Sequence, residues 1–185
     1  GLTEFGIEMI QEMERLGMIV DVSHLSDGGF WDVLHHTTQP FVASHSDAAS
    51  ECNVCRNLTD DMIRALADRG GVMGLNYCHD FLTESDKPTA LSADTSLFMD
   101  AGKQTKKISR MEDMVRHIKH IVNIGGIEVC GLGSDFDGIN NSVEFGNASG
   151  VQQLYEALVK SGFSEDDADK IFYKNVLRVY QDVLK

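Results

Sequence analysis

Two short apolar runs near the start of the chain each end in a polar cluster that contains a histidine. Residues 18–22 lead into His24, and residues 41–43 lead into His45. Short runs of β-branched and apolar residues that end in polar residues are typical of buried strands. Because the carboxyl ends of parallel strands meet at one edge of a sheet, both histidines are expected where α/β proteins bind ligands and metals. The pattern predicts a parallel α/β fold with a candidate metal site.

The rest of the chain continues this alternation of strands and helices. Further strands are expected at residues 72–77 and 129–133. Helices are expected at residues 3–15, 27–36, 59–67, 111–124, 150–160 and 164–184, with a break or bend near residues 173–175. Such alternation implies a parallel sheet. Four strand–helix units make half of an eight-stranded (β/α)8 TIM-type barrel, so we expect residues 1–185 to form a single domain that supplies about the last four βα units.

A long polar stretch, residues 78–107, separates the third predicted strand from the next helix. Loops longer than about 15 residues in compact domains tend to be lids or binding loops. We therefore predict that residues 78–107 are an insertion in a βα loop, which could hold helical turns.

Composition limits the classes of function. The chain has 185 residues, of which 42% are hydrophobic, and a net charge of −13. This acidic charge argues against nucleic acid or an anionic membrane as partner. No stretch approaches the roughly 20 apolar residues of a membrane span, and the first residues lack the features of a signal peptide. A cytoplasmic location and a small-molecule or metal ligand are expected.

The four cysteines indicate thiols in a reducing compartment rather than a disulfide framework. Cys52 and Cys55 form a Cys-x-x-Cys pair, which is half of a zinc-ribbon pattern. No second pair follows at suitable spacing. The interpretation as loop cysteines is favoured over a zinc ribbon.

Three residues at predicted strand ends are candidates for chemistry: His24, His45 and Asp135. Imidazole and carboxylate groups are the ligands of zinc in sites that keep a position open for water. Arg56, after the second strand, could grip a substrate carboxylate with two parallel hydrogen bonds, although a surface arginine fits the pattern equally well. His117 and His120 lie one turn apart on a predicted outer helix, so packing and surface positions are favoured over metal binding.

Five stretches of the chain match motifs of a known family. They are residues 1–6 (GLTEFG), 15–24 (RLGMIVDVSH), 43–46 (ASHS), 56–61 (RNLTDD) and 133–138 (GSDFDG). In their order and spacing they resemble the membrane dipeptidase (renal dipeptidase) family of zinc metallopeptidases. The resemblance covers essentially all of this chain but only the carboxyl-terminal half of the family's (β/α)8 barrel.

The resemblance implies a function and a role for each candidate residue. His24 and His45 would be the two histidine ligands of one zinc in a two-zinc site, and Arg56 would hold the terminal carboxylate of the substrate. Asp135 would be the acid/base group and would contact the substrate's amino end. The reaction would be hydrolysis of dipeptides, including those with a D-residue on the carboxyl side. Two metals about 3.5–4 Å apart would lower the pKa of a bound water towards ~7 and polarise the scissile carbonyl.

Other parts of the family's site have no counterpart in this chain. They are a His-x-Asp pair on the first strand, a glutamate that bridges both metals and a histidine that stabilises the oxyanion. This chain alone is therefore expected to bind one zinc or none and to hydrolyse no dipeptide at a useful rate. Its expected partners are a dipeptide substrate and either the missing amino-terminal half-barrel or further copies of itself.

Two alternatives stay open at this point. One is a catalytically incomplete half-barrel that binds metal weakly or oligomerises to cover its sheet edges, since exposed edges favour pairing. The other is a different metal-dependent hydrolase on the same barrel, such as a cyclic amidase or a deaminase. Arg56 argues against the second alternative, because it indicates a substrate with a carboxylate.

Overall fold

A parallel sheet lies at the centre of the fold. The computed structural model describes residues 1–83, 107–140 and 142–184. Within them, β1 (Val42–Ala43), β2 (Val72–Leu75) and β4 (Cys130–Leu132) are neighbours in the order β1-β2-β4, all parallel. Three of the predicted strands are thus confirmed, in the predicted parallel arrangement.

The first predicted strand, residues 18–22, lies beside β1 but is less regular than predicted. Asp21 forms an isolated parallel bridge with Val42. The backbone N–H of Val22 donates to the carbonyl of Val42 (2.8 Å), and the N–H of Val42 donates to the carbonyl of Val20 (2.9 Å). The segment continues the sheet by one further position, so four parallel segments follow one another in chain order.

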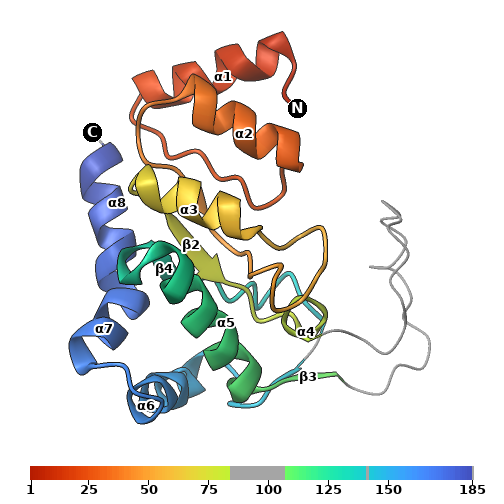
Figure 1. Cartoon of the computed structure of the whole chain (residues 1–185), viewed down its shortest axis with the longest axis vertical. Coiled ribbons are helices and arrows are strands. Elements are labelled where there is room, and N and C mark those ends of the chain that lie inside the picture. The colour runs from red at the N-terminus through yellow and green to blue at the C-terminus, as the bar shows by residue number, and fades with distance from the viewer. Residues whose placement is uncertain (84–106, 141, 185) are drawn as a thin grey trace.

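Helices connect these segments and cover the sheet (Figure 1). Before β1 come α1 (Glu4–Arg15) and α2 (Asp27–His36); α3 (Asp60–Asp68) joins β1 to β2, and α5 (Met111–Gly125) precedes β4. After β4 the chain forms α6 (Gln152–Lys160), α7 (Glu165–Asp169), a π-helical turn (Lys170–Lys174) and α8 (Asn175–Val183). In Figure 1, α3 and α5 lie side by side next to β2, and α6 and α7 lie at the end of the molecule opposite α1.

Several further elements are short. The helix α4 (His79–Leu82) opens the proposed insertion 78–107, where helical turns were allowed for; residues 84–106 lie outside the described part of the chain. The remaining short elements were not predicted. The strands β3 (Ile108–Ser109) and β5 (Ser142–Val143) pair in parallel as a second small sheet. A 3-10 turn, Ile127–Val129, occupies the first position of the predicted strand 129–133, and another, Ala148–Gly150, precedes α6.

The helix starts follow from local sequence. Side chains of the N-cap residues accept a hydrogen bond from a backbone N–H of the first turn in α1, α2, α3 and α7, where these residues are Thr3, Ser26, Thr59 and Ser164. Such caps satisfy donors that the helix itself leaves unpaired. In α7, Ser164 and Asp167 form a reciprocal capping box.

The core lies between the sheet and the helices that pack on it. Fully buried side chains come from α3, α5 and the strands, and include Ile63, Leu66, Met73, Leu75, Met114, Ile118 and Ile121. Their spacing in α3 and α5 is that of one helix face, which explains why the periodicity of the sequence predicted both helices. Through Met73 and Leu75, this packing includes the central strand β2.

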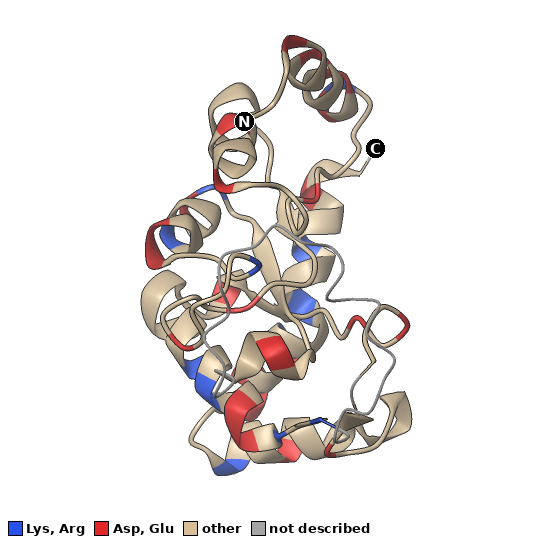
Figure 2. Ribbon diagram, turned by 90° about the vertical axis from the view of Figure 1, so that its right-hand side faces the viewer, with Lys and Arg blue, Asp and Glu red and all other residues tan. Residues whose placement is uncertain are grey.

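The charge of the chain is distributed over its surface. Acidic segments are spread over several helices and loops in Figure 2 and outnumber the basic ones. No helix in the described ranges is both long enough and apolar enough to cross a lipid bilayer.

One buried histidine of α5 makes stability dependent on pH. The neutral ring of His117 accepts a hydrogen bond from the N–H of Ala48 at Nδ1 (3.2 Å) and donates from Nε2 to the carbonyl of Leu82 (3.0 Å). Burial lowers the pKa of His117 to about 4, whereas an unfolded histidine titrates near 6.5. Between these values the unfolded chain binds a proton that the folded chain does not. The free energy of unfolding therefore falls as the pH drops through this window, by on the order of 3 kcal/mol for this residue.

The pH dependence predicted for His117 can be tested by unfolding the unmodified protein and a His117→Gln variant in urea over a range of pH. The stability advantage of the unmodified protein should shrink between about pH 6.5 and about pH 4. Burial also raises the pKa of Asp47, so this carboxyl makes the folded chain more stable as the pH falls, which is opposite to the effect of His117. Subtracting one stability profile from the other removes this shared contribution. His36→Gln, at an exposed position of α2, is the control. Parallel profiles for all three proteins would show that His117 is not the titrating group.

Candidate metal and substrate site

The two candidate metal ligands meet at the carboxyl ends of the first two parallel segments. His24 and His45 face each other with their Nε2 atoms 2.8 Å apart, and their ring centroids are 4.8 Å apart. They are separated by 21 residues in the sequence, so only the parallel pairing of their segments brings them together. This arrangement is the one predicted from the two apolar runs.

Hydrogen bonds from the preceding residues fix the backbone on both sides of this pair. The Ser23 hydroxyl accepts from the N–H of His45 (2.9 Å). The Ser44 oxygen lies 2.7 Å from Nδ1 of His45, and the Ser44 hydroxyl donates to Oδ2 of Asp21 (2.5 Å). Burial raises the pKa of Asp21, but the hydrogen bonds from Ser44 and Ser23 outweigh this effect and hold the pKa below its usual value.

Asp135 follows β4 in a backbone conformation that few residues adopt. Its φ is 57°, in the left-handed region, where aspartate and asparagine are the best tolerated residues after glycine. Its Oδ2 accepts a hydrogen bond from the side-chain amide of the fully buried Asn76 (3.1 Å). A Cβ atom at Gly138 would come within 2.2 Å of Oδ1 of Asp135, so a larger residue at this position would force the Asp135 side chain to shift.

Arg56 belongs to the same charged group. Its guanidinium lies 5.5 Å from the centre of the Phe81 ring, within the range of a cation–π contact. Burial lowers the pKa of Arg56, and the negative charge of Asp135 opposes this shift. Burial also lowers the pKa of His24; the charge of Arg56 lowers it further, while Asp135 raises it. The four predicted site residues therefore form one electrostatically connected group.

Asp47, which was not predicted, supports the same edge of the sheet. Its side chain is fully buried, and Oδ1 accepts a hydrogen bond from the backbone N–H of Asn76 (3.0 Å). Asn76 in turn binds Asp135. The sequence offered a signal for Asp47, because it lies two residues after His45 in the polar cluster that ends a predicted strand. Charged residues are rarely buried without a partner.

The donor set fits part of a zinc site. Two imidazole nitrogens on one tetrahedral zinc, each about 2.0–2.1 Å from the metal, would lie roughly 3.3 Å apart. The observed 2.8 Å between the Nε2 atoms needs only a small separation of the rings to reach this value. Within the described ranges no three His, Cys, Asp or Glu side chains converge as ligands. A zinc site that included this pair would need further ligands beyond the described residues.

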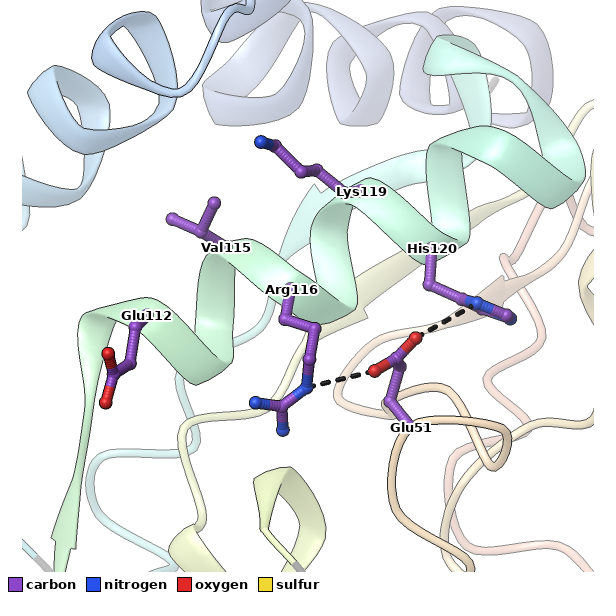
Figure 3. A pocket seen from close by; sticks show the side chains of 6 residues that line it. All are labelled: Glu51, Glu112, Val115, Arg116, Lys119 and His120. Carbon is purple, nitrogen blue, oxygen red and sulfur yellow. Dashed lines mark ion pairs between the residues drawn. The ribbon is translucent and has the colours of Figure 1, made fainter.

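His117, His120 and Cys52 contact groups other than the His24–His45 pair. His117 is buried in the core. The ring nitrogens of His120 lie 3.2 Å from a carboxylate oxygen of Glu51 and 2.8 Å from one of Asp60. Both positions agree with the packing and surface roles that were favoured for these residues. Figure 3 shows His120 and Glu51 at a surface hollow beside α5. Cys52 is buried, with its Sγ 3.6 Å from the carbonyl oxygen of Asp80, while Cys55 is exposed.

The comparison with known proteins identifies a family. The family model described as membrane dipeptidase (peptidase family M19) matches residues 1–185. An uncharacterized protein from the pqqA 5' region of Klebsiella pneumoniae is 39% identical over 183 residues, which are 99% of this chain and 61% of that protein. An uncharacterized dipeptidase of Schizosaccharomyces pombe is 34% identical over 185 residues, covering 98% of this chain and 39% of that protein.

A solved structure extends the likeness to three dimensions. A metallopeptidase from Rhodobacter sphaeroides, bound to a phosphinate mimic of the dipeptide L-Ala-D-Ala, matches this chain with a TM-score of 0.82 and 29% identity. The match covers 99% of this chain and 47% of that chain. The chain thus spans about half the length of the proteins it matches, and its fold is that of part of a TIM-type barrel. Because the family model matches the chain along its whole length, the chain belongs to the membrane dipeptidase family, peptidase family M19.

Proposed function

We propose that the protein hydrolyses dipeptides with zinc bound at His24 and His45. The observation that carries this proposal is the facing pair of Nε2 atoms 2.8 Å apart, with Asp135 and Arg56 acting on the same site. Bound zinc would supply an activated water and polarise the scissile carbonyl. The L-Ala-D-Ala mimic seen in the Rhodobacter sphaeroides relative supports dipeptides with a D-residue on the carboxyl side as substrates.

The chain's own residues would bind the substrate and move its proton. Arg56 would hold the terminal carboxylate of the dipeptide through two parallel hydrogen bonds, which selects a free carboxyl end. Asp135 would accept the proton of the attacking water and deliver it to the nitrogen of the leaving amine. Asn76, bonded to Oδ2 of Asp135, would keep that carboxylate in place. Arg56 also favours a dipeptidase over a cyclic amidase or deaminase.

The complete site would need more than the residues described here. The chain spans about half the length of its relatives, and the two histidines are only part of a zinc ligand set. We therefore propose that the remaining ligands come from an amino-terminal half-barrel that closes the sheet. A second copy of this chain is the alternative source.

The test uses the intact protein that carries this chain. We expect zinc in the purified protein and cleavage of L-Ala-D-Ala that a chelator abolishes and zinc restores. Arg56→Lys should raise KM for dipeptides by about 10–100-fold, because it removes one charge-assisted hydrogen bond of roughly 1.5–3 kcal/mol. The same variant should leave the slow cleavage of a dipeptide amide unchanged, since that substrate has no carboxylate. Arg64→Lys, at a surface arginine paired with Asp61, is the control.

Two results would contradict the proposal. A zinc-loaded intact protein that cleaves no dipeptide would support the non-catalytic alternative. Equal loss of dipeptide and dipeptide-amide cleavage in Arg56→Lys would show that Arg56 does not recognise the carboxylate.

A further inference from the structure

The carboxylate of Asp21 accepts hydrogen bonds from both segments that carry the histidine pair. Its Oδ1 accepts from the backbone N–H groups of Ser23 (3.1 Å) and Ser44 (3.0 Å), and its Oδ2 accepts from the Ser44 hydroxyl (2.5 Å). Ser23 and Ser44 directly precede His24 and His45. Both oxygens of Asp21 are thus engaged within the protein, which suits a supporting position better than direct metal binding.

The direction of these hydrogen bonds determines where His45 carries its hydrogen. A carboxylate has no hydrogen to donate, so the hydroxyl hydrogen of Ser44 points to Asp21. The Ser44 oxygen then accepts from Nδ1 of His45, 2.7 Å away. His45 therefore carries its hydrogen on Nδ1 and has a lone pair on Nε2, the atom that faces His24.

We propose that Asp21 and Ser44 are positioning residues that hold His45 in the Nδ1–H tautomer, so that Nε2 is presented as a metal ligand. Histidine ligands commonly donate their second ring N–H to a carboxylate or carbonyl, which fixes the ring and makes the ligand nitrogen more basic. Here a serine hydroxyl stands between imidazole and carboxylate. The metal part of this inference rests on the proposed function, whereas the tautomer does not.

The tautomer is tested on the metal-free intact protein. Long-range ¹H–¹⁵N correlation spectra of ¹⁵N-histidine-labelled protein at neutral pH distinguish the two tautomers of each ring. We expect Nδ1–H for His45 in the unmodified protein and a shift to Nε2–H in Ser44→Ala. Ser44→Thr, which retains a hydroxyl, should restore Nδ1–H. Because Ser44 is exposed and caps no helix, the alanine variant is expected to fold, and its melting temperature checks this.

Metal affinity is the second readout. Zinc titration of Ser44→Ala and Asp21→Asn should show binding weakened by about 10–100-fold, the usual cost of losing a group that supports a ligand. Ser50→Ala is the matched control, because the Ser50 hydroxyl also donates to a carboxylate, that of Asp60 (3.0 Å), away from the histidine pair. It should change neither readout.

The outcomes separate this inference from the proposed function. If Ser44→Ala keeps His45 in the Nδ1–H form, or binds zinc as tightly as Ser50→Ala does, the positioning role is wrong. Suppose that His45 is in the Nδ1–H form in the unmodified protein and shifts to Nε2–H in Ser44→Ala, but that the unmodified protein binds no zinc and cleaves no dipeptide. The hydrogen-bond chain from His45 through Ser44 to Asp21 is then supported, and the proposed function fails.

Discussion

Replacing His24 or His45 by alanine is expected to lower kcat/KM for L-Ala-D-Ala by at least about 10³-fold, equivalent to roughly 4 kcal/mol of transition-state stabilisation. The two rings face each other with Nε2 atoms 2.8 Å apart, so removing either one leaves a single imidazole where two would share a metal. Zinc content per chain should fall in both variants. Both measurements are made on the intact protein, by dipeptide cleavage and by elemental analysis.

The matched control is His36→Ala, at an exposed histidine of α2 that lies outside the pair. It should retain zinc and full activity. The double variant lacking both His24 and His45 should be little worse than either single variant, because residues that act as one unit are not additive. Unchanged turnover in His24→Ala or His45→Ala would refute the ligand role of that histidine.

The sequence predicted these two residues because each follows an apolar run, a pattern that local sequence contains. It could not predict which groups support them. Asp21 reaches Ser44 across 23 residues, and Asn76 reaches Asp135 across 59. Such contacts depend on how strand ends align in three dimensions, and many polar residues near strand ends are equally plausible partners before that alignment is known.

The same limit explains the errors in the fold. The strands β3 and β5 have only two residues each, too few for an alternating pattern to appear. The residues 18–22 read as a regular strand, but the segment pairs with β1 through one isolated bridge. In contrast, the bend predicted near residues 173–175 coincides with the end of the π-helical turn. There the buried Asn175 side chain donates to the carbonyls of Ile127 (2.7 Å) and Cys130 (2.8 Å).

Asp135→Asn is expected to lower kcat for dipeptides by about 10²–10⁴-fold, the usual contribution of a positioned acid/base group. Asparagine has nearly the same shape and tolerates the left-handed backbone conformation, in which Asp135 has a φ of 57°. The substitution therefore removes the charge and the basicity of the carboxylate and leaves the loop intact. Steady-state kinetics with L-Ala-D-Ala measures the loss, and zinc content should stay at the level of the unmodified protein.

Asp137→Asn provides a matched control for this experiment, because Asp137 is a carboxylate in the same loop, two residues away and exposed. If Asp135 moves the proton, its variant should lose kcat while Asp137→Asn keeps it. A loss that appears equally in both variants would instead indicate a general effect of negative charge near the site. If Asp135→Asn changed only KM, the residue would bind the substrate's amino end without transferring a proton, since the loss would then lie in ground-state binding. Separate measurement of kcat and KM thus distinguishes the two roles assigned to this carboxylate.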